Sequence, residues 1–420
     1  MKNQNHEIDR NFTRLYIDET EISVESGLPA ARVTPPGPVA ARSAVTGPGR
    51  VFRHSEMGTM GFDDSAWRLD EGRNYYVLTR DYDTQHAGAK APADIRRVCL
   101  DLGFKPVDLP VVPVARFDRR NLKRYLLGPL KLLRLIARAR ATDIVLVQHP
   151  IVGRLEKRLI PRLCRRCRTI ALVHDLDIIR NQENLEYDDL TFLSHFDVII
   201  SQNDKMLEYV EEKIPRVQNV SIDLFDYLTT RDAQVAWSAA PGRLYIIGNL
   251  NPDKAGYLYA IQGVKLPIWA YGPNCETQKL PAGVAWKGVL DMHNPAFGAV
   301  DGFGVVWDGR SADGLEGVWG RYLLYNTPHK LSMYMMLGMP VIVPSESAVA
   351  RFVVDSGIGF AVGSLQEADD LVSSLSPDAW DRLRQNVLAA RRGIMGGAYT
   401  RKAMRGALVA LGAVQEDRAS

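Results

Sequence analysis

The stretch YNTPHKLSMYMMLGMPVIVP, residues Tyr325 to Pro344, combines an apolar helical pattern with a short apolar run typical of a buried strand. The beginning of this helix is different, because four polar residues stand where the helix should start: Asn326, Thr327, His329 and Lys330. A helix that runs directly into a buried strand predicts an α/β unit. Its polar start raises the question of what these donors bind.

The same alternation of strand and helix extends in both directions from this unit. In the first half, NYYVLTRDY, DIVLVQHP, TIALVHDL and DVIISQ are β-rich apolar runs separated by helical segments. In the second half the corresponding runs are RLYIIGNL, PIWAYGP, FGVVWDG, MPVIVP and IGFAVG. This order predicts parallel sheets covered on both faces, with ligands at the carboxyl ends of the strands.

Small and turn residues in RDAQVAWSAAPGR, Arg231 to Arg243, indicate a linker between two domains. We therefore expect two doubly wound domains that face each other across a cleft. The first covers residues 71–235, and the second covers residues 236–420 together with the C-terminal helices. Residues 1–70 include a segment rich in Gly, Pro, Ala and Ser, which predicts a disordered or loosely packed lead.

Composition excludes several classes of protein. The 420 residues carry a formal net charge of only +3, which argues against a nucleic-acid-binding protein. No apolar run reaches the roughly 18–20 residues that span a bilayer. The N-terminal residues also lack the apolar core of a secretory signal. These features predict a cytoplasmic protein.

The four cysteines are too few for a disulfide framework in a chain of this length. Cys164 and Cys167 have CxxC spacing within LCRRCR, but no two further ligands with zinc-site spacing accompany them. The flanking arginines should lower the pKa of both thiols. A pair of ordinary surface or core cysteines is still favoured over a redox site.

The start of the helix in Tyr325–Pro344 suits a phosphate. Thr327 is a good N-cap and Pro328 suits the first helical position, so His329 and Lys330 occupy the first turn. Amide groups there have no partner inside the helix, and the positive end of the helix dipole favours an anion. Asn326 adds a side-chain donor. The alternative is an ordinary capping pair whose His and Lys face solvent.

A second polar cluster, His174, Asp175, Asp177 and Arg180, follows directly after the run TIALV. The D-x-D spacing of the two aspartates resembles the metal ligands of some glycosyltransferases, whereas an Asp after a strand also commonly caps the next helix. Arg180 suits bidentate binding of a phosphate.

Two glycine-containing turns are further candidates. Gly248, Asn249 and Lys254 follow the run RLYII, where glycine lets a ligand approach the backbone. This turn is not a G-x-G-x-x-G fingerprint, so it does not support dinucleotide binding or an epimerase. Gly88 and Lys90 open the helix after the first strand, where a substrate could lie. An ordinary tight turn is the alternative.

The segment from Lys123 to Ala141 predicts an amphipathic helix with leucines on one side and Lys and Arg on the other. Two interpretations stay open. The helix either contacts a membrane surface, or it packs on the sheet and exposes a solvated basic face.

Taken in order, HAGAKAPADI, HDLDIIR, FDVIISQNDKMLEYV, FDYL, FGVVWDG and YNTPHKLSMYMMLGMPVIVP resemble one bacterial family. That family contains the third glucosyltransferase of serine-rich adhesin glycosylation and the β-1,6-galactofuranosyltransferases. The resemblance covers about residues 74–363, and HDLDIIR and NTPHK are its most specific blocks. A retaining family with a Glu-x7-Glu pair matches poorly, because Tyr325 and Met333 occupy those positions.

The resemblance implies the GT-B fold, with two Rossmann-like domains that hold the donor mainly in the second and the acceptor in the first. It also implies a UDP-sugar donor, no essential metal or cofactor, and inversion at the anomeric carbon. The residues that it carries over to the donor site are Arg180, Asn249, Asn326, His329 and Lys330.

From the residues and the resemblance together we expect a UDP-sugar-dependent hexosyltransferase, with glucose or galactofuranose as the sugar and a glycan, glycolipid or glycoprotein as the acceptor. Lys330 should stabilise the departing diphosphate, and a carboxylate should deprotonate the acceptor. The predicted donor-binding residues are Arg180, Gly248, Asn249, Lys254, Asn326, Thr327, His329 and Lys330. The predicted acceptor-side residues are Gly88, Lys90 and His174. The candidate bases are Asp83, Asp175 and Asp177.

Several alternatives stay open at this point. The chain could be a metal-dependent transferase that uses the DLD aspartates, or a non-catalytic sugar-nucleotide- or glycan-binding partner of another transferase. Self-association into a homo-oligomer and contact with the inner face of the membrane are open as well. The sugar, the linkage and the purpose of the first seventy residues are not encoded in any pattern that we identify.

Overall fold

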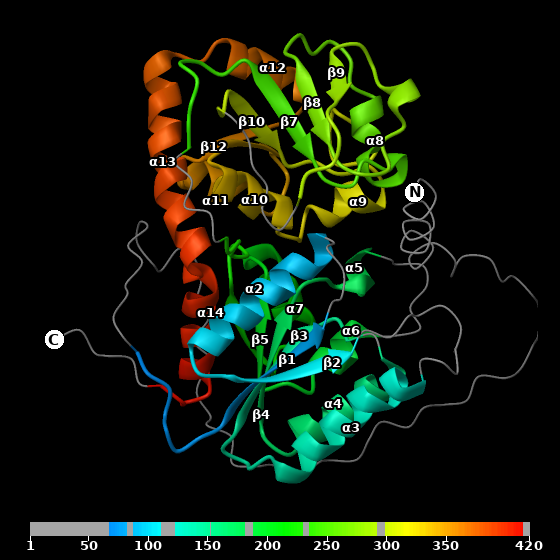
Figure 1. Cartoon of the computed structure of the whole chain (residues 1–420), viewed down its shortest axis with the longest axis vertical. Coiled ribbons are helices and arrows are strands. Elements are labelled where there is room, and N and C mark those ends of the chain that lie inside the picture. The colour runs from blue at the N-terminus through cyan, green and yellow to red at the C-terminus, as the bar shows by residue number, and fades with distance from the viewer. Residues whose placement is uncertain are drawn as a thin grey trace, which may run out of the picture.

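The computed structural model describes residues 67–81, 87–110, 122–151, 153–180, 188–229, 235–291 and 299–414. The predicted lead lies almost entirely outside these residues. Figure 1 shows two α/β domains stacked along the long axis of the molecule, each built around its own sheet. Both sheets have six strands, and every strand pair in them is parallel. The two-domain α/β architecture predicted from the alternating pattern is confirmed.

The first sheet has the order β2-β1-β3-β4-β5-β6. Apolar clusters cover both of its faces, as expected for strands buried on two sides. Its strands are β1 (Tyr75–Asp81), β2 (Lys105–Pro110), β3 (Ile144–His149), β4 (Arg168–Val173), β5 (Val198–Ser201) and β6 (Gln218–Ser221). Its helices are α2 (Ala87–Asp101), α3 (Leu122–Arg138), α4 (Arg154–Cys164), α5 (Asp177–Arg180), α6 (Asp189–Leu193) and α7 (Asp204–Lys213).

The second sheet has the order β12-β11-β10-β7-β8-β9, so the direction of winding reverses between β7 and β10. Ligands of open α/β sheets bind at such a switch point. The strands are β7 (Arg243–Ile247), β8 (Ile268–Tyr271), β9 (Val284–Trp286), β10 (Gly302–Val305), β11 (Val341–Pro344) and β12 (Gly359–Val362). The helical elements are α8 (Pro252–Tyr259), η3 (Thr277–Lys279), α9 (Gly317–Tyr322), α10 (His329–Leu337), α11 (Ala350–Asp355), α12 (Leu365–Ser373) and α13 (Pro377–Gly396).

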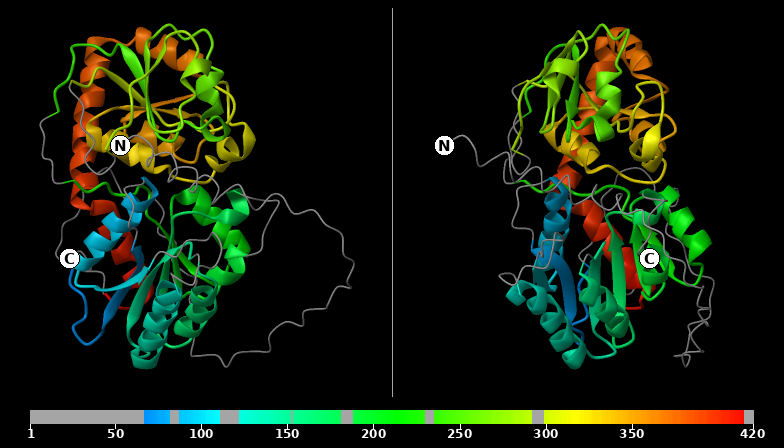
Figure 2. Two further views of the ribbon diagram at one scale, coloured as in Figure 1. Left: turned by 45° about the vertical axis from the view of Figure 1, so that its right-hand side comes forward. Right: turned by 90° about the vertical axis from the view of Figure 1, so that its right-hand side faces the viewer.

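The last helix, α14 (Ala398–Ala410), returns to the first domain. Figures 1 and 2 show α13 descending beside the second domain and α14 lying against the first sheet, where it contacts β5, β6 and α2. The sequence assigned all C-terminal helices to the second domain. The structure differs because the apolar face of α14, which includes Met404 and Leu408, completes the core over Val220 of β6.

The buried carboxylate of Asp226 fixes the start of α14. It accepts hydrogen bonds from the backbone N–H groups of Tyr399 at 3.2 Å and Thr400 at 2.7 Å. Burial raises the pKa of Asp226 to about 7, although these hydrogen bonds favour the ionised form. The C-terminal helix is therefore attached to the first domain by polar contacts as well as by its apolar face.

Helix α10 is attached to the switch point through Tyr334. Its ring lies over Gly304 of β10, and its hydroxyl accepts the Ile247 N–H at 2.8 Å. The same hydroxyl lies 3.1 Å from the Tyr245 carbonyl and 3.3 Å from that of Val305, so it can donate to either. Tyr334 thus satisfies backbone groups where pairing between β7 and β10 stops, and it fixes α10 relative to both strands.

The predicted lowering of the cysteine pKa values is wrong. Burial raises the pKa of both Cys164 and Cys167 to about 12, and neighbouring arginines oppose this only weakly. The side chain of Cys167 points into the core, with its Sγ 3.6 Å from the Leu163 carbonyl oxygen. Cys167 is therefore a core group and Cys164 a partly buried one packed against the same core, and all four cysteines are free.

We predict that Gly304→Ala destabilises the second domain. A Cβ at this position would lie 2.3 Å from the ring of Tyr334. Overpacking of this kind costs about 1–3 kcal/mol, so the midpoint of chemical denaturation should fall. The matched control is Gly396→Ala near the end of α13, where no atom lies within 4 Å of the added Cβ. Equal stability of the two variants would contradict the role given to Tyr334.

Candidate active site

The candidate site lies where the carboxyl ends of both sheets approach each other. Helix α5 follows β4 of the first domain and contacts α9 of the second. The segments after β7 and β10 and the start of α10 lie on the other side. The structure therefore brings together residues that the sequence could place only at separate strand ends.

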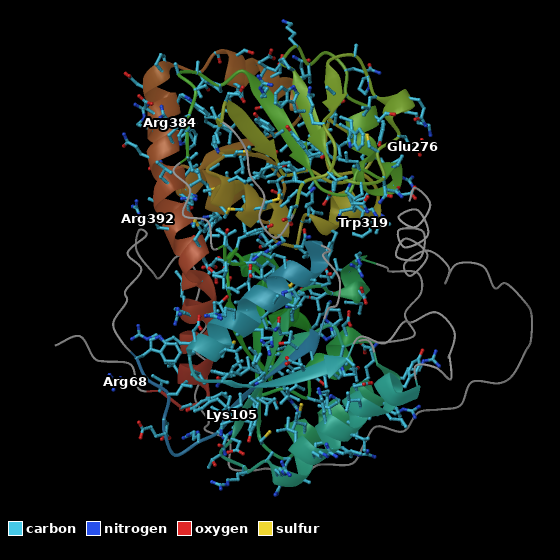
Figure 3. All side chains as sticks on the ribbon, viewed as in Figure 1. Arg68, Lys105, Glu276, Trp319, Arg384 and Arg392 are labelled. Carbon is cyan, nitrogen blue, oxygen red and sulfur yellow. The ribbon has the colours of Figure 1, made fainter. Side chains whose placement is uncertain are left out.

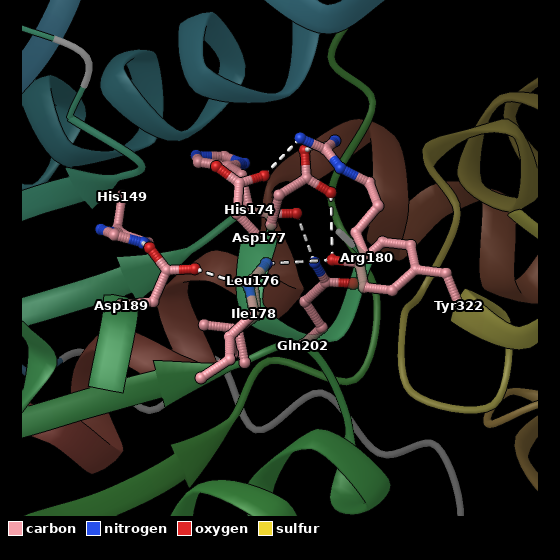
Figure 4. A network of polar contacts seen from close by, with 10 residues as sticks. His149, His174, Leu176, Asp177, Ile178, Arg180, Asp189, Gln202 and Tyr322 are labelled. Atoms are coloured by element: carbon pink, nitrogen blue, oxygen red, sulfur yellow. Dashed lines mark hydrogen bonds and ion pairs between the residues drawn. The ribbon is translucent and has the colours of Figure 1, made fainter. Parts of the chain in front are cut away.

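Arg180 is buried and forms ion pairs with two carboxylates, Asp175 at 3.4 Å and Asp177 (Figure 4). The Tyr322 hydroxyl of α9 donates to Asp175 at 3.1 Å and accepts the N–H of Leu176 at 3.1 Å. Burial raises the pKa of Asp175, while the nearby guanidinium of Arg180 opposes that rise. The DLD segment thus holds an arginine and is linked to the second domain.

Trp319 of α9 places its ring near cations from both domains. Its position at the end of the second domain facing the first is shown in Figure 3. The Arg180 Cζ lies 5.7 Å from the ring centroid, and the Lys254 Nζ of α8 lies 4.8 Å from it. Cation–π contacts of this kind hold both cationic side chains at the domain interface.

Lys330, in the first turn of α10, is largely buried. Its Nζ donates to Asp308 Oδ1 at 2.7 Å and to the Trp307 carbonyl oxygen at 2.8 Å. Burial lowers the pKa of Lys330, the Asp308 carboxylate opposes this, and Lys254 adds to it. An ammonium group has three N–H donors, and the third has no protein acceptor among the described residues.

The start of α10 differs in detail from the prediction. The helix begins at His329 with Pro328 as its N-cap, so Thr327 does not cap it. Instead Thr327 binds the first domain: its N–H donates to Gln202 Oε1 at 2.6 Å, and its hydroxyl accepts from Asn203 Nδ2 at 2.9 Å. Tertiary contacts have replaced local capping, and they connect the start of the helix to both domains.

Asn326 immediately precedes this start. Its side-chain oxygen is buried and has no hydrogen-bond partner among the described residues. Buried polar atoms normally have partners, so an orphaned one beside a candidate site suggests that a ligand completes it.

The two predicted histidines lie in one aromatic cluster between the domains. His329 stacks on Tyr227, with centroids 5.0 Å apart and planes 18° apart, and its ring also approaches Phe225 at 6.2 Å. His174 stacks on the same Phe225 at 5.4 Å. Burial lowers the pKa of His329 to about 4 and that of His174 to about 3, so both rings are neutral at pH 7.

The position of the proton on His174 follows from Gln148. The amide nitrogen of Gln148 donates to the Pro92 carbonyl at 3.1 Å, so its oxygen faces His174 Nε2 at 2.7 Å. Nε2 therefore carries the hydrogen, and the lone pair of the neutral ring is on Nδ1.

The remaining predicted residues have different surroundings. Lys90 is buried in an ion pair with Asp94, and its Nζ also donates to the Leu228 carbonyl at 2.6 Å. Gly88 and Gly248 have open space where a Cβ would project, and Gly248 adopts a φ of 152°. Asn249 is exposed and accepts hydrogen bonds from its neighbours Asn251 and Asn274. Asp83 lies outside the described residues.

Within the described parts of the chain, no three His, Cys, Asp or Glu side chains gather in a way that could hold a metal ion. The aspartates of the DLD segment both form ion pairs with Arg180.

Comparison with known proteins identifies the family. The family model for the N-terminal domain of glucosyltransferase 3-like proteins matches residues 74–222, and the model for their C-terminal domain matches residues 244–407. The chain belongs to the glucosyltransferase 3-like family. The predicted family is confirmed, and the two matched segments end and begin on either side of the predicted linker.

Among the relatives of this chain, β-1,6-galactofuranosyltransferase WbbI of Escherichia coli (strain K12) is 27% identical over 333 residues, which cover 78% of this chain and 96% of WbbI. Glucosyltransferase 3 of Streptococcus gordonii is 24% identical over 327 residues, which cover 75% of this chain and 92% of that protein. Because these relatives are glycosyltransferases that match this chain over most of its length, the chain is a glycosyltransferase.

The fold is shared with solved glycosyltransferases. A glycosyltransferase from Rickettsia africae ESF-5 matches with a TM-score of 0.50 and 12% identity, covering 80% of this chain and 99% of that one. The GT-B fold of this glucosyltransferase 3-like protein, with two Rossmann-like domains, is confirmed.

Sequence reasoning missed four residues of the site: Asp308, Trp319, Tyr322 and Gln202. Asp308 follows the run FGVVW at a strand end, so the rule that selected His174 and Asp175 would also have found it. Trp319 and Tyr322 lie in the short helix α9, whose sequence GVWGRY carries no functional pattern. Their importance comes from contacts with distant residues.

We predict that Tyr322→Phe weakens the connection between the domains. The change leaves the buried Leu176 N–H without its acceptor, which costs about 1–3 kcal/mol and should lower the melting temperature. Tyr209→Phe is the matched control, because Tyr209 is a partly buried tyrosine that makes a ring contact with Tyr325 but no described hydrogen bond through its hydroxyl. A loss of stability no greater than that of the control would contradict the role of the Tyr322 hydroxyl.

Proposed function

We propose that this glycosyltransferase moves a hexosyl unit from a UDP-sugar to a glycan or glycoconjugate, with inversion and without a metal ion. The observation that carries this proposal is the pair of cations, Lys254 and Lys330, beside the start of α10 at the switch point of the second sheet.

The charged side chains on the second-domain side of the site favour binding of an anion. Asp308 pairs with Lys330, whereas the side chain of Lys254 has no hydrogen bond or ion pair among the described residues, so one positive charge is in excess. The first-turn amides of α10 and the positive end of its dipole add to this excess. A diphosphate fits such a surface, and the third N–H of Lys330 would reach one of its oxygens.

The first-domain side of the site has the opposite balance. Asp175 and Asp177 share Arg180 as their ion-pair partner, so one carboxylate charge is in excess, and the charge of Lys254 across the site also acts on Asp175. Their side chains keep 36% and 38% of their surface exposed, which makes them accessible to an acceptor. The raised pKa of Asp175 suits a general base, so Asp175 is the base that we favour, with Asp177 second.

These two sides support a one-step displacement. The acceptor hydroxyl attacks the anomeric carbon while its proton passes to the carboxylate, and the bond from that carbon to the UDP oxygen breaks. Negative charge grows on the departing diphosphate, where Lys330, Lys254 and the helix amides stabilise it. Attack from the face opposite the leaving group inverts the anomeric configuration. Gly248 leaves open space beside this position for the rest of the donor.

The sugar is proposed from the relatives alone. WbbI is named a galactofuranosyltransferase and its streptococcal relative a glucosyltransferase, so UDP-galactofuranose and UDP-glucose are the first donors to test. Binding of the right donor should raise the melting temperature by mass action.

We predict that Lys330→Gln lowers turnover of the preferred UDP-sugar by about a hundredfold or more and reduces the thermal shift that UDP produces. A purely structural role of Lys330, to neutralise Asp308, has to be separated from this one. The double variant Lys330→Gln/Asp308→Asn restores the charge balance and should recover the melting temperature but not turnover. Recovery of turnover in the double variant would reject diphosphate binding by Lys330.

We also predict that dialysis against EDTA leaves turnover unchanged. Lys330, Lys254 and the positive end of the α10 dipole supply the positive charge that a divalent ion supplies in metal-dependent transferases. The same preparation with added Mg²⁺ or Mn²⁺ is the comparison. Activity that EDTA abolishes and either ion restores would favour the metal-dependent alternative built on the DLD aspartates.

A further inference from the structure

The outward surface of α3 and α4 combines apolar and basic side chains. Helix α3 buries Leu132 and Leu135 against the first sheet. Its solvent-facing side carries four leucines with between 41% and 47% of their surface exposed, namely Leu126, Leu127, Leu130 and Leu133. The helix thus packs on the sheet, as the second interpretation has it, but its outer side is apolar as well as basic.

This exposure is concentrated. Among the described residues, nine large apolar side chains are strongly exposed, and five of them lie on α3 and α4, counting Leu155 of α4. Scattered exposed leucines need no explanation, but a group on two adjacent helices marks an interaction surface. Figure 1 shows these helices side by side at the outer end of the first domain.

The same segment is strongly basic. Residues 122–168 contain 13 Lys and Arg against two acidic residues, a net charge of +11, whereas the whole chain carries +3. The two acidic residues, Asp143 and Glu156, are buried. Glu156 lies beneath Gly128, where a Cβ would come within 2.3 Å of its carboxylate, so α3 and α4 pack closely over it. The exposed charge is almost purely positive.

The exposed leucines gather toward one end of the two helices. Helix α3 ends five residues before β3 begins, so its C-terminus lies at the amino edge of the sheet. Its 17 residues extend for roughly 25 Å, which places the leucine-rich half toward the carboxyl edge. Leu155 lies at the same edge because α4 follows β3. Arg134 and Arg138 lie toward the opposite end of α3.

We propose that this α3–α4 surface docks on an anionic lipid bilayer, with the leucines inserted among the acyl chains and the basic side chains on the headgroups. No helix among the described residues is long and apolar enough to cross a membrane, so the contact is peripheral. The two helices alone carry nine Lys and Arg against one acidic residue, a net charge of +8 that opposes pairing with a second copy of the same surface. Nucleic acid would satisfy the charge but would leave the leucines exposed to water.

The experiment is flotation of the full chain with vesicles of phosphatidylcholine alone or mixed with phosphatidylglycerol. We expect binding to the mixed vesicles, little binding to the neutral ones, and weaker binding at high salt. The combined change Leu126→Ser/Leu130→Ser/Leu133→Ser should lower partitioning by about tenfold or more. Arg134→Gln/Arg138→Gln should weaken binding and reduce its salt dependence.

The matched control is Val354→Ser, which changes a 53% exposed apolar side chain on α11 of the second domain. It should bind vesicles as the unchanged protein does. All variants should keep the melting temperature and the UDP-induced thermal shift, which separates this test from that of the proposed function. Failure of the unchanged protein to bind anionic vesicles overturns the proposal. So does normal binding by the leucine variant, or displacement by a DNA duplex that is insensitive to the leucine changes.

Discussion

The hydroxyl of Tyr334 is the contact on which the geometry of the site depends. It binds backbone groups of β7 and β10 at the position where these strands stop pairing, and its ring lies over a residue that must be glycine. Helix α10 is thereby fixed at the switch point of the second sheet. Because Lys330 lies one turn before Tyr334, the same contact sets the position of its ammonium group relative to Asp308.

The first domain positions this helix from the other side. Gln202 and Asn203, at the end of β5, bind the backbone and side chain of Thr327. Tyr322 connects α9 to the backbone of the DLD segment, and α14 attaches the end of the chain to the first sheet. Several hydrogen bonds therefore cross the domain interface, and each requires its donor and acceptor in a fixed orientation. This arrangement keeps the cationic and acidic sides of the site facing each other.

Much of the fold could be predicted from sequence because long apolar, β-rich runs identify strands buried on both faces. The runs that were missed are β2, β6 and β9, whose sequences KPVDLP, QNVS and VAW are short or polar. Their pairing partners stabilise them as strands, and this information is not local. The placement of α14 in the first domain was missed for the same reason, since a helix pattern shows which face is apolar but not which sheet it covers.

The residues of the site were likewise found where their signal is local in the sequence and missed where it depends on distant contacts. Polar residues directly after apolar strands were found from sequence, among them Asp175, Arg180 and the residues before α10. Trp319 and Tyr322 were not, because Tyr322 meets Asp175 across 147 positions of the chain. The thiol pKa values were predicted with the wrong sign, because sequence shows the neighbouring arginines but not the burial that outweighs them.

The most direct test of the account is a crystal structure of the protein with UDP bound. The account predicts diphosphate oxygens within hydrogen-bond distance of the first-turn amides of α10 and of Lys330 Nζ, with Lys254 alongside. A diphosphate bound elsewhere, with Lys330 still engaged only by Asp308 and Trp307, would contradict it.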